Sequence, residues 1–244
     1  MYTLNLSSLK VILVEPQIPG NVGAVARVLK NFGVKSLYLV RPHSFLSKEA
    51  LSRASKAEDI LYRAKLFSSL EDAITDCQYI VTTTARKRYK ISTLMPRKVA
   101  PLLSAISQNN RIGLVFGPER SGLKNKELLL GHIFLTIPTD TSYSSLNLAQ
   151  AVGIVLYELF LQTRYSVSQK IPKIATSSQL NAMYAHLMEI LNKIGFVKKE
   201  GEEHVLFVIK RIFNKILLEE EDVRVIRGIC RQINWYALRN KVSK

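Results

Sequence analysis

Cysteine is scarce in this chain of 244 residues, which contains only Cys77 and Cys230. The two lie far apart and form no Cys-x-x-Cys pair, so the sequence predicts neither a disulfide framework nor a zinc site. The four histidines are scattered, with neither metal-ligand spacing nor a partnered nucleophile, and we predict no metal centre and no catalytic triad. A chain of this length can fold by packing alone, and we expect it in a reducing compartment.

Long hydrophobic runs are also missing. The longest apolar stretch, residues 151–157, is too short to cross a bilayer. The amino terminus lacks the order of basic, apolar and small residues that marks a signal peptide. We therefore expect a soluble, cytoplasmic protein that does not enter a membrane.

Acidic residues are few, because 19 Asp and Glu stand against 35 Lys and Arg, which gives a formal charge of +16. Such an excess favours an anionic partner, through phosphate contacts that release counterions. Nucleic acid and a membrane surface are both candidates. Most of the excess lies in residues 1–175, so we expect the polyanion to meet the first part of the chain.

Short runs rich in Val, Ile and Leu predict strands at residues 10–15, 35–40, 65–67, 78–83, 112–116 and 133–137. They lack strict alternation, which is typical of strands covered on both faces. Between them lie helix signals, such as the apolar face of residues 22–29, which stops at Gly33, and a capping box at residues 68–71. Each run alone also fits a buried helix fragment, but the regular alternation favours an α/β fold with a parallel sheet and helices on both faces.

The pattern changes after Ile137. Residues 144–147 open a long helix in which residues 151–160 are apolar on almost every face. Such a helix must be buried all round, and we expect a second subunit of a homodimer to cover part of it. We predict a first domain at residues 1–162, a linker at 163–176 and a helical second domain at 177–244.

The second domain is expected to be a small all-α bundle. Helical spacing is found at residues 179–194, 205–217 and 223–235. We expect Ser177 and Ser178 to cap the first of these helices, and the acidic residues 219–222 to start the last.

The loop at residues 15–23 leaves the carboxyl end of a predicted strand and enters a helix, where open parallel sheets bind ligands. We expect Arg27 one turn into that helix. Its guanidinium, near the free amides of the helix start, is suited to hold an RNA phosphate or to orient a ribose. The alternative is an exposed helix arginine, with Asn21 as the cap of the helix.

A second loop, residues 116–124, also follows a buried strand. It carries Glu119 between Gly117 and Gly122, which let backbone and ligand approach closely. It is not a Walker A loop, because Leu123 stands where a lysine is required, and the chain has no GxGxxG motif after a strand. The alternative is a glycine-rich turn from strand to helix.

Two further segments are rich in polar groups at predicted strand ends. Residues 137–147 carry more hydroxyl and amide groups than an N-cap at Ser144 or Ser145 requires, which favours a ligand site. In residues 82–88 the threonine hydroxyls would face a ligand while Arg86, Lys87 and Arg88 follow phosphates. A solvated run of charges explains that second segment equally well.

Three of these segments, in order, resemble the motifs of the SpoU (TrmH) branch of the SPOUT-class RNA 2′-O-methyltransferases. They are Asn21-x-Gly23-x-x-x-Arg27, Phe116-Gly117-x-Glu119-x-x-Gly122-Leu123, and Ile137-Pro138 followed by Tyr143-Ser144-Ser145-Leu146-Asn147. The resemblance spans about residues 9–162. Thr83-Thr84-Ala85-Arg86, Tyr143 and the helical tail make the chain most similar to TrmJ-like tRNA (cytidine/uridine-2′-O-)-methyltransferases.

The resemblance implies that the carboxyl-terminal part of the first domain threads into a trefoil knot, an exception to the general absence of knots. It also implies S-adenosyl-L-methionine as the methyl donor, held largely by backbone groups. The implied donor site consists of Thr83, Thr84, Ala85, Gly117, Ile137, Ser144, Ser145 and Leu146.

The same resemblance assigns Arg27 to the chemical step, with Asn21, Glu119, Ser145 and Asn147 shaping the same corner. An arginine, whose pKa lies above about 12, is a poor base, so we expect Arg27 to hold phosphate and ribose and to stabilise developing negative charge. RNA contacts are expected from Arg27, Arg86, Lys87, Arg88 and Arg120. The role of Asp140 stays open.

The implied activity is 2′-O-methylation of a tRNA ribose, at nucleotide 32 of the anticodon loop. One alternative is an rRNA ribose 2′-O-methyltransferase of the same fold. The other is a non-catalytic RNA-binding module, against which the intact Arg27, Glu119 and Asn147 argue. The basic residues of the tail, such as Arg227, either grip the tRNA or form a solvated helix face.

Overall fold

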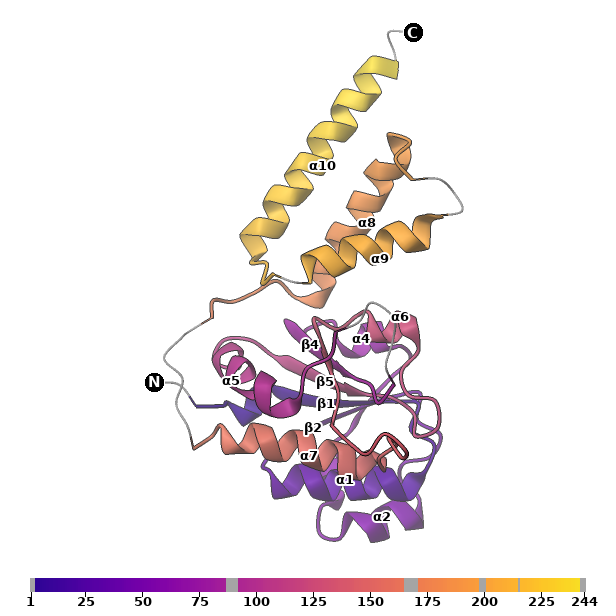
Figure 1. Cartoon of the computed structure of the whole chain (residues 1–244), viewed down its shortest axis with the longest axis vertical. Helices are drawn as coiled ribbons and strands as arrows, with labels where there is room; N and C mark the ends of the chain where they lie inside the picture. The colour runs from indigo at the N-terminus through magenta and orange to yellow at the C-terminus, as the bar shows by residue number, and fades with distance from the viewer. Residues whose placement is uncertain (1–2, 87–91, 165–170, 198–200, 215, 242–244) are drawn as a thin grey trace. The chain divides into compact units, whose positions relative to one another are not determined.

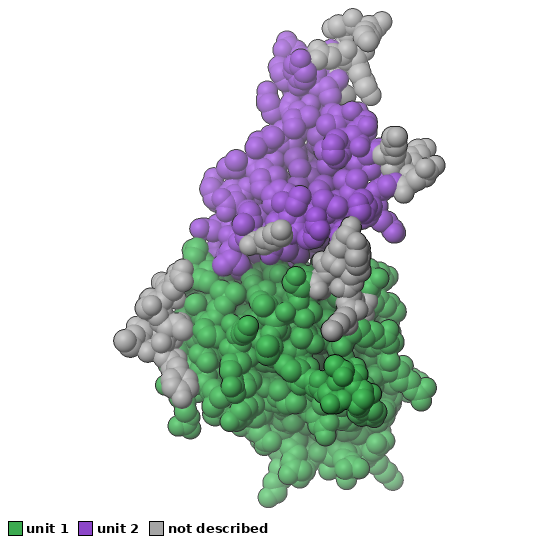
Figure 2. Space-filling view, in the orientation of Figure 1, with its two compact units in different colours: residues 1–172 green, residues 173–244 purple. Residues whose placement is uncertain are grey.

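The computed structural model describes residues 3–86, 92–164, 171–197, 201–214 and 216–241. The chain divides into two compact units, residues 1–172 and 173–244, each with its own interior (Figure 2). The boundary between the units falls inside the predicted linker. Asn109 and Asn110 donate side-chain hydrogen bonds to the carbonyls of Ile171 and Pro172. These bonds attach residues 171 and 172 of the predicted linker to the rest of the first unit.

The first unit is built on a parallel sheet in the order β3-β2-β1-β5-β4-β6, which confirms the predicted α/β class. Its strands are β1 (Leu9–Val14), β2 (Ser36–Val40), β3 (Lys65–Phe67), β4 (Tyr79–Thr83), β5 (Ile112–Phe116) and β6 (Ile133–Leu135). Every residue of the central strands β1 and β5 is buried. Coverage on both faces is why these strands appear in the sequence as continuous apolar runs.

Helices cover both faces of this sheet (Figure 1). They are α1 (Pro19–Asn31), α2 (Lys48–Ala54), α3 (Glu58–Tyr62), α4 (Leu70–Ala73), α5 (Pro96–Ile106), α6 (Asn125–Leu128) and α7 (Leu148–Leu161). On one side α1 packs against both α2 and α7. On the other, Leu70 of α4 and Leu128 of α6 join a buried cluster with Ile12 and Val115 of the central strands.

Three predicted helix caps, those of α4, α7 and α8, are wrong by one to three residues. Helix α4 is capped by Ser69, whose hydroxyl accepts from the amide of Asp72. The observed cap therefore lies one residue after the start of the capping box predicted at residues 68–71. Helix α7 is capped by Asn147, whose Oδ1 accepts from the amides of the first turn, and neither Ser144 nor Ser145 is the cap. Where several Ser, Thr and Asn are adjacent, any of them can cap, and the tertiary contacts of the flanking loop decide between them.

Helix α7 is the predicted apolar helix, and it is only partly covered within this chain. Val152, Val155 and Leu159 are buried, whereas Ile154 and Tyr157 are 38% and 51% exposed. The predicted second subunit would cover such a face, and this stays a prediction.

The described part of the second unit is helical, with α8 (Ser177–Lys193), α9 (Glu202–Phe213) and α10 (Glu220–Lys241). Its interior is formed by Leu180, Met183 and Tyr184 of α8 together with Val223 of α10. Helix α8 is capped by Thr176, whose hydroxyl accepts from the amide of Gln179, so the predicted cap at Ser177 and Ser178 is wrong. Among the described residues, no helix has the length and apolar character needed to cross a membrane.

Candidate active site

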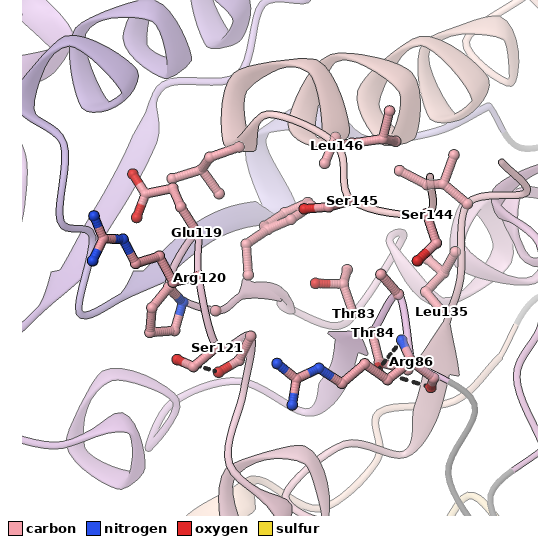
Figure 3. A pocket seen from close by; sticks show the side chains of 18 residues that line it. Thr83, Thr84, Arg86, Glu119, Arg120, Ser121, Leu135, Ser144, Ser145 and Leu146 are labelled. Atoms are coloured by element: carbon pink, nitrogen blue, oxygen red, sulfur yellow. Dashed lines mark hydrogen bonds between the residues drawn. The ribbon is translucent and has the colours of Figure 1, made fainter. Parts of the chain in front are cut away.

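A pocket of about 220 Å³ lies where the loops after β4, β5 and β6 meet the start of α7 (Figure 3). Its position at the carboxyl ends of parallel strands is the usual location of a ligand site in an open α/β sheet. The eight residues predicted to form the donor site all line this pocket: Thr83, Thr84, Ala85, Gly117, Ile137, Ser144, Ser145 and Leu146. Four separate stretches of the sequence therefore converge on one cavity.

The threonines after β4 are not equivalent. Thr82 is buried and donates its hydroxyl to the carbonyl of Leu128, so the expectation that its hydroxyl faces a ligand is wrong. Thr83 lines the pocket and donates to the carbonyl of Val115 at 3.0 Å, which leaves its oxygen as an acceptor. The hydroxyl oxygen of Thr84 accepts from the amide of Arg86 at 3.2 Å, which fixes the turn at the pocket edge.

The loop after β5 closes on itself. The amide of Gly122, at φ +63°, donates to the carbonyl of Pro118 at 2.8 Å. A Cβ on Gly117 would lie 2.3 Å from the amide nitrogen of Leu123, so only glycine fits there. The ring so formed carries Glu119 and Arg120, both of which line the pocket (Figure 3).

Glu119 is the centre of a polar network that joins all three motifs. Its carboxylate accepts from the amides of Gln17 at 3.0 Å and Ile18 at 3.3 Å, and from Nδ2 of Asn21 at 2.9 Å. Asn147 donates in turn from its Nδ2 to Oδ1 of Asn21 at 2.8 Å. The start of α1, the loop after β5 and the start of α7 are thereby held in one corner.

This network also corrects the alternative that Asn21 caps the first helix. Helix α1 begins at Pro19, its N-cap residue is Ile18, and no side chain of its own segment caps it. The carboxylate of Glu119 instead accepts from the amides of Gln17 and Ile18, the two residues before the helix, and its negative charge there complements the helix dipole.

Arg27 lies on the exposed surface of α1 and is not among the residues that line the pocket. Because α1 begins at Pro19, Arg27 stands about two turns into the helix, not the single turn that we expected. Arg86 and Arg120 are exposed and line the pocket. Lys87 and Arg88 lie outside the described residues.

Asp140 is occupied by its own loop. Its Oδ1 accepts from the amide of Ser142 at 2.8 Å and from the hydroxyl of the same serine. These hydrogen bonds hold the pKa of Asp140 below its usual range. The carboxylate shapes the loop before the pocket, and Asp140 does not itself line the cavity.

Sequence reasoning missed the apolar wall of the pocket, formed by Phe116, Leu135, Leu148 and Ala151. Each stands at the end of a strand or in the first turn of α7, and that position was the available signal. It also missed a charged group at the ends of β1 and β2, where Arg41 binds Glu15 at 2.8 Å and approaches Glu127 at 3.5 Å. The guanidinium of Arg41 holds the pKa of Glu15 below its usual value.

The ring of His132 is held by structural contacts. Its Nδ1 accepts from the amide of Ile80 at 3.0 Å, and its ring stacks on Tyr79. Burial lowers the pKa of His132 to about 4, so the imidazole is neutral near pH 7. Among the described residues, no group of His, Cys, Asp and Glu is arranged to hold a metal ion.

Comparison with known proteins gives two family matches. The model of the SpoU rRNA Methylase family matches residues 8–157, and that of the C-terminal domain of the tRNA methyltransferase TrmJ matches residues 178–243. The tRNA (cytidine/uridine/adenosine-2′-O-)-methyltransferase TrmJ of Pseudomonas aeruginosa is 34% identical over 241 residues, which cover 93% of this chain and 94% of that protein. TrmJ of Escherichia coli K12 is 32% identical, with 98% and 100% covered.

Solved structures agree with these matches. The crystal structure of TrmJ from Z. mobilis has a TM-score of 0.81 at 31% identity, and covers 92% of this chain and 98% of that one. A structure described as giving insights into the 2-OH methylation of C/U34 on tRNA has a TM-score of 0.53 at 26% identity, and covers 66% of this chain and 100% of that one. The chain therefore belongs to the SpoU methylase family and, within it, to the TrmJ group of tRNA methyltransferases.

Proposed function

We propose that this protein transfers the methyl group of S-adenosyl-L-methionine to the 2′-hydroxyl of a tRNA ribose, at nucleotide 32 of the anticodon loop. The observation that carries the proposal is the convergence of the motifs. All eight expected donor-site residues line one pocket, and Glu119, which also lines it, links that pocket to α1 and thereby to Arg27. Relatives of the same length are named as tRNA 2′-O-methyltransferases.

The residues of the pocket fit such a donor. The apolar wall of Phe116, Leu135 and Leu148 suits an adenine ring. Gly117 lets the loop fold tightly on itself, and residues 116–122 of that loop form one side of the pocket. The hydroxyls of Ser144 and Ser145 are available for the polar parts. When bound, the donor supplies an electrophilic methyl group, so the protein needs chiefly to align the two substrates.

Arg27 is assigned to the RNA side of the reaction. It is exposed on α1, where its guanidinium can hold the phosphate and ribose of the target nucleotide. A permanent positive charge there stabilises the negative charge that develops on the ribose oxygen as its proton is lost. Asn21, Glu119, Ser145 and Asn147 keep this corner in place.

The basic side chains at the pocket extend this RNA surface. Arg86 and Arg120 are suited to phosphates on either side of the target nucleotide. We further propose that a second copy of the chain covers Ile154 and Tyr157 on α7 in a cytoplasmic homodimer, and that the end of the first unit is threaded as a trefoil knot. Equilibrium sedimentation at micromolar concentration tests the dimer, and a monomer there would count against it.

The decisive experiment is to incubate the protein with unmodified total tRNA and labelled donor, and to map the methylated ribose. We expect label at nucleotide 32. Position 34 is named for the solved structure that is 26% identical to this chain. Label at nucleotide 34 would show that the proposed target position is wrong and would leave the proposed reaction unchanged. Label in purified rRNA and none in tRNA would favour the rRNA alternative, and no label in either would favour a non-catalytic module.

Arg27→Ala tests the role of Arg27 in the same assay. We expect it to remove most turnover while donor affinity, measured by calorimetry, stays nearly intact, because Arg27 does not line the pocket. Equal loss of turnover and of donor affinity would contradict its assignment to the RNA side.

A further inference from the structure

Tyr143 is more exposed than any other large apolar side chain in the described residues, with 79% of its surface accessible. Within that part of the chain no hydrogen bond or ring contact involves its side chain. An aromatic ring in water with no contact contributes little to the fold, and exposed aromatic side chains commonly mark binding surfaces. Its place in the chain is directly before Ser144 and Ser145, which line the pocket.

The backbone that carries this ring is well defined. The carboxylate of Asp140 accepts from the amide and hydroxyl of Ser142, and the amide of Tyr143 donates to the carbonyl of Asp140 at 3.2 Å. The hydroxyl of Thr139 donates to the carbonyl of Ser144 at 3.4 Å. This closed turn holds Tyr143 beside the pocket, so little backbone freedom is lost when a ligand binds there.

We infer that Tyr143 is a base-stacking residue, and that its ring stacks on the base of the nucleotide whose ribose is methylated. The inference rests on the proposed function. A ribose that presents its 2′-oxygen to the pocket carries its base on the neighbouring carbon, so the base lies just outside the cavity. An exposed ring at the adjoining turn is placed to receive it, and stacking requires only the π-face that every base has. The interaction positions the nucleotide without selecting among bases.

The first test is steady-state kinetics with Tyr143→Ala and Tyr143→Phe. We expect the alanine variant to raise KM for tRNA about 5- to 100-fold, the ratio that corresponds to base–aromatic stacking. Phenylalanine retains the ring and should behave like wild type. Donor affinity and melting temperature should change little, because the side chain is 79% exposed and makes no hydrogen bond or ring contact with the described residues. Tyr62→Ala is the matched control, since Tyr62 is 66% exposed on α3 and does not line the pocket.

The second test identifies the partner of the ring by a double-mutant cycle. Wild type and Tyr143→Ala are each assayed on intact tRNA and on tRNA with an abasic target nucleotide. If the ring stacks on that base, removal of the base raises KM of the wild type and raises KM of the alanine variant little further. Additive losses, or an alanine variant that is as active as wild type, would overturn the stacking role.

Other outcomes also separate the hypotheses. A change in oligomeric state on Tyr143→Ala, with additive losses in the cycle, would make the ring a contact between two copies of the chain and overturn the inference. Failure of wild type to methylate any tRNA would overturn the proposed function, and the stacking role with it. If the wild type methylates tRNA but the double-mutant cycle shows no coupling between ring and base, only the stacking role is overturned.

Discussion

Glu119 offers the sharpest test of how the site is assembled. Its carboxylate accepts three hydrogen bonds from the segment at the start of α1, two from the backbone amides of Gln17 and Ile18 and one from Asn21. Glu119→Ala removes all three acceptors at once. Glu119→Gln retains the shape but presents an amide group to donors, so part of the network is lost and the charge at the helix start disappears.

The magnitude follows from what each contact contributes. A typical hydrogen bond contributes about 1 kcal/mol, and a negative charge beside a helix start contributes roughly 0.3–1 kcal/mol. Water can reach Gln17 and Ile18, whose hydrogen bonds are exposed, which reduces the total. We expect Glu119→Ala to lower the free energy of unfolding of the first unit by about 2 kcal/mol, and Glu119→Gln by about 1 kcal/mol.

The assay must report on the first unit alone. The single tryptophan, Trp235, lies in α10 of the second unit, so its fluorescence serves as an internal control that should not change. Hydrogen exchange of the amides of Gln17 and Ile18 measures the local effect, and exchange of the buried amides of β1 and β5 in increasing urea measures the unfolding of the first unit. Glu71→Ala, the loss of an exposed acid on α4, is the control variant.

Two results together would refute this reasoning. If the free energy of unfolding of Glu119→Ala lies within about 0.5 kcal/mol of the wild-type value, the effect is no larger than that of an ordinary surface substitution. The network would then not stabilise the first unit. If the two amides also stay as protected as in wild type, the carboxylate does not hold the segment that leads into α1. We expect instead that turnover falls with amide protection, since Arg27 stands on the helix whose start is loosened.

Three further predictions concern close packing and pH. Gly23→Ala places a Cβ 2.0 Å from the carbonyl oxygen of Ala50, so α2 must shift, and we expect a loss of about 1–3 kcal/mol in unfolding experiments. Gly117→Ala forces open the loop at Leu123, and we expect donor affinity in calorimetry to fall more than stability does. Gly153→Ala, where a Cβ would meet nothing closer than 3.8 Å, is the control for both and should not be destabilising. The unfolded chain protonates His132 near its ordinary pKa of 6.5, whereas the folded protein does so only at about 4, so stability is lost as pH falls below 6.5. Between pH 7 and 5.5 we expect this residue to account for a decrease of about 1 kcal/mol, and His132→Gln should flatten that part of the profile.

The strands could be predicted because parallel strands covered on both faces form continuous apolar runs. Residues 112–116 coincide with β5, and most other strands differ by one or two residues at their ends. The edge strand β3 also coincides with the predicted residues 65–67, although two of its three residues are exposed. Helix starts were harder to predict. Asn147 and Ser145 are both good caps, and Asn147, which caps α7, is also bonded to Asn21, which lies more than a hundred residues away in sequence.

The donor-site residues could be proposed only because the motifs resemble a family. Composition and spacing indicated polar loops at strand ends but could not show that they meet. That step depends on strand order, because β4 lies between β5 and β6 and brings the loops after all three strands to one edge of the sheet. The apolar residues of the wall were not assigned to the site, although Phe116 stands in one of these motifs.

Strand order also explains how Glu119 contacts both the pocket and the segment at the start of α1. Strands β1 and β5 are neighbours, and Leu13 pairs with Phe116, so the loops that carry Gln17 and Glu119 leave the sheet at the same level. The loop after β5 therefore faces two ways. Towards β4 it lines the pocket, and towards β1 it binds the segment that leads into α1, the helix that carries Arg27. If the pocket binds the donor and Arg27 binds the RNA, as we propose, Glu119 holds the two sides of the reaction at a fixed distance. A substitution there should then affect alignment more than the binding of either substrate alone.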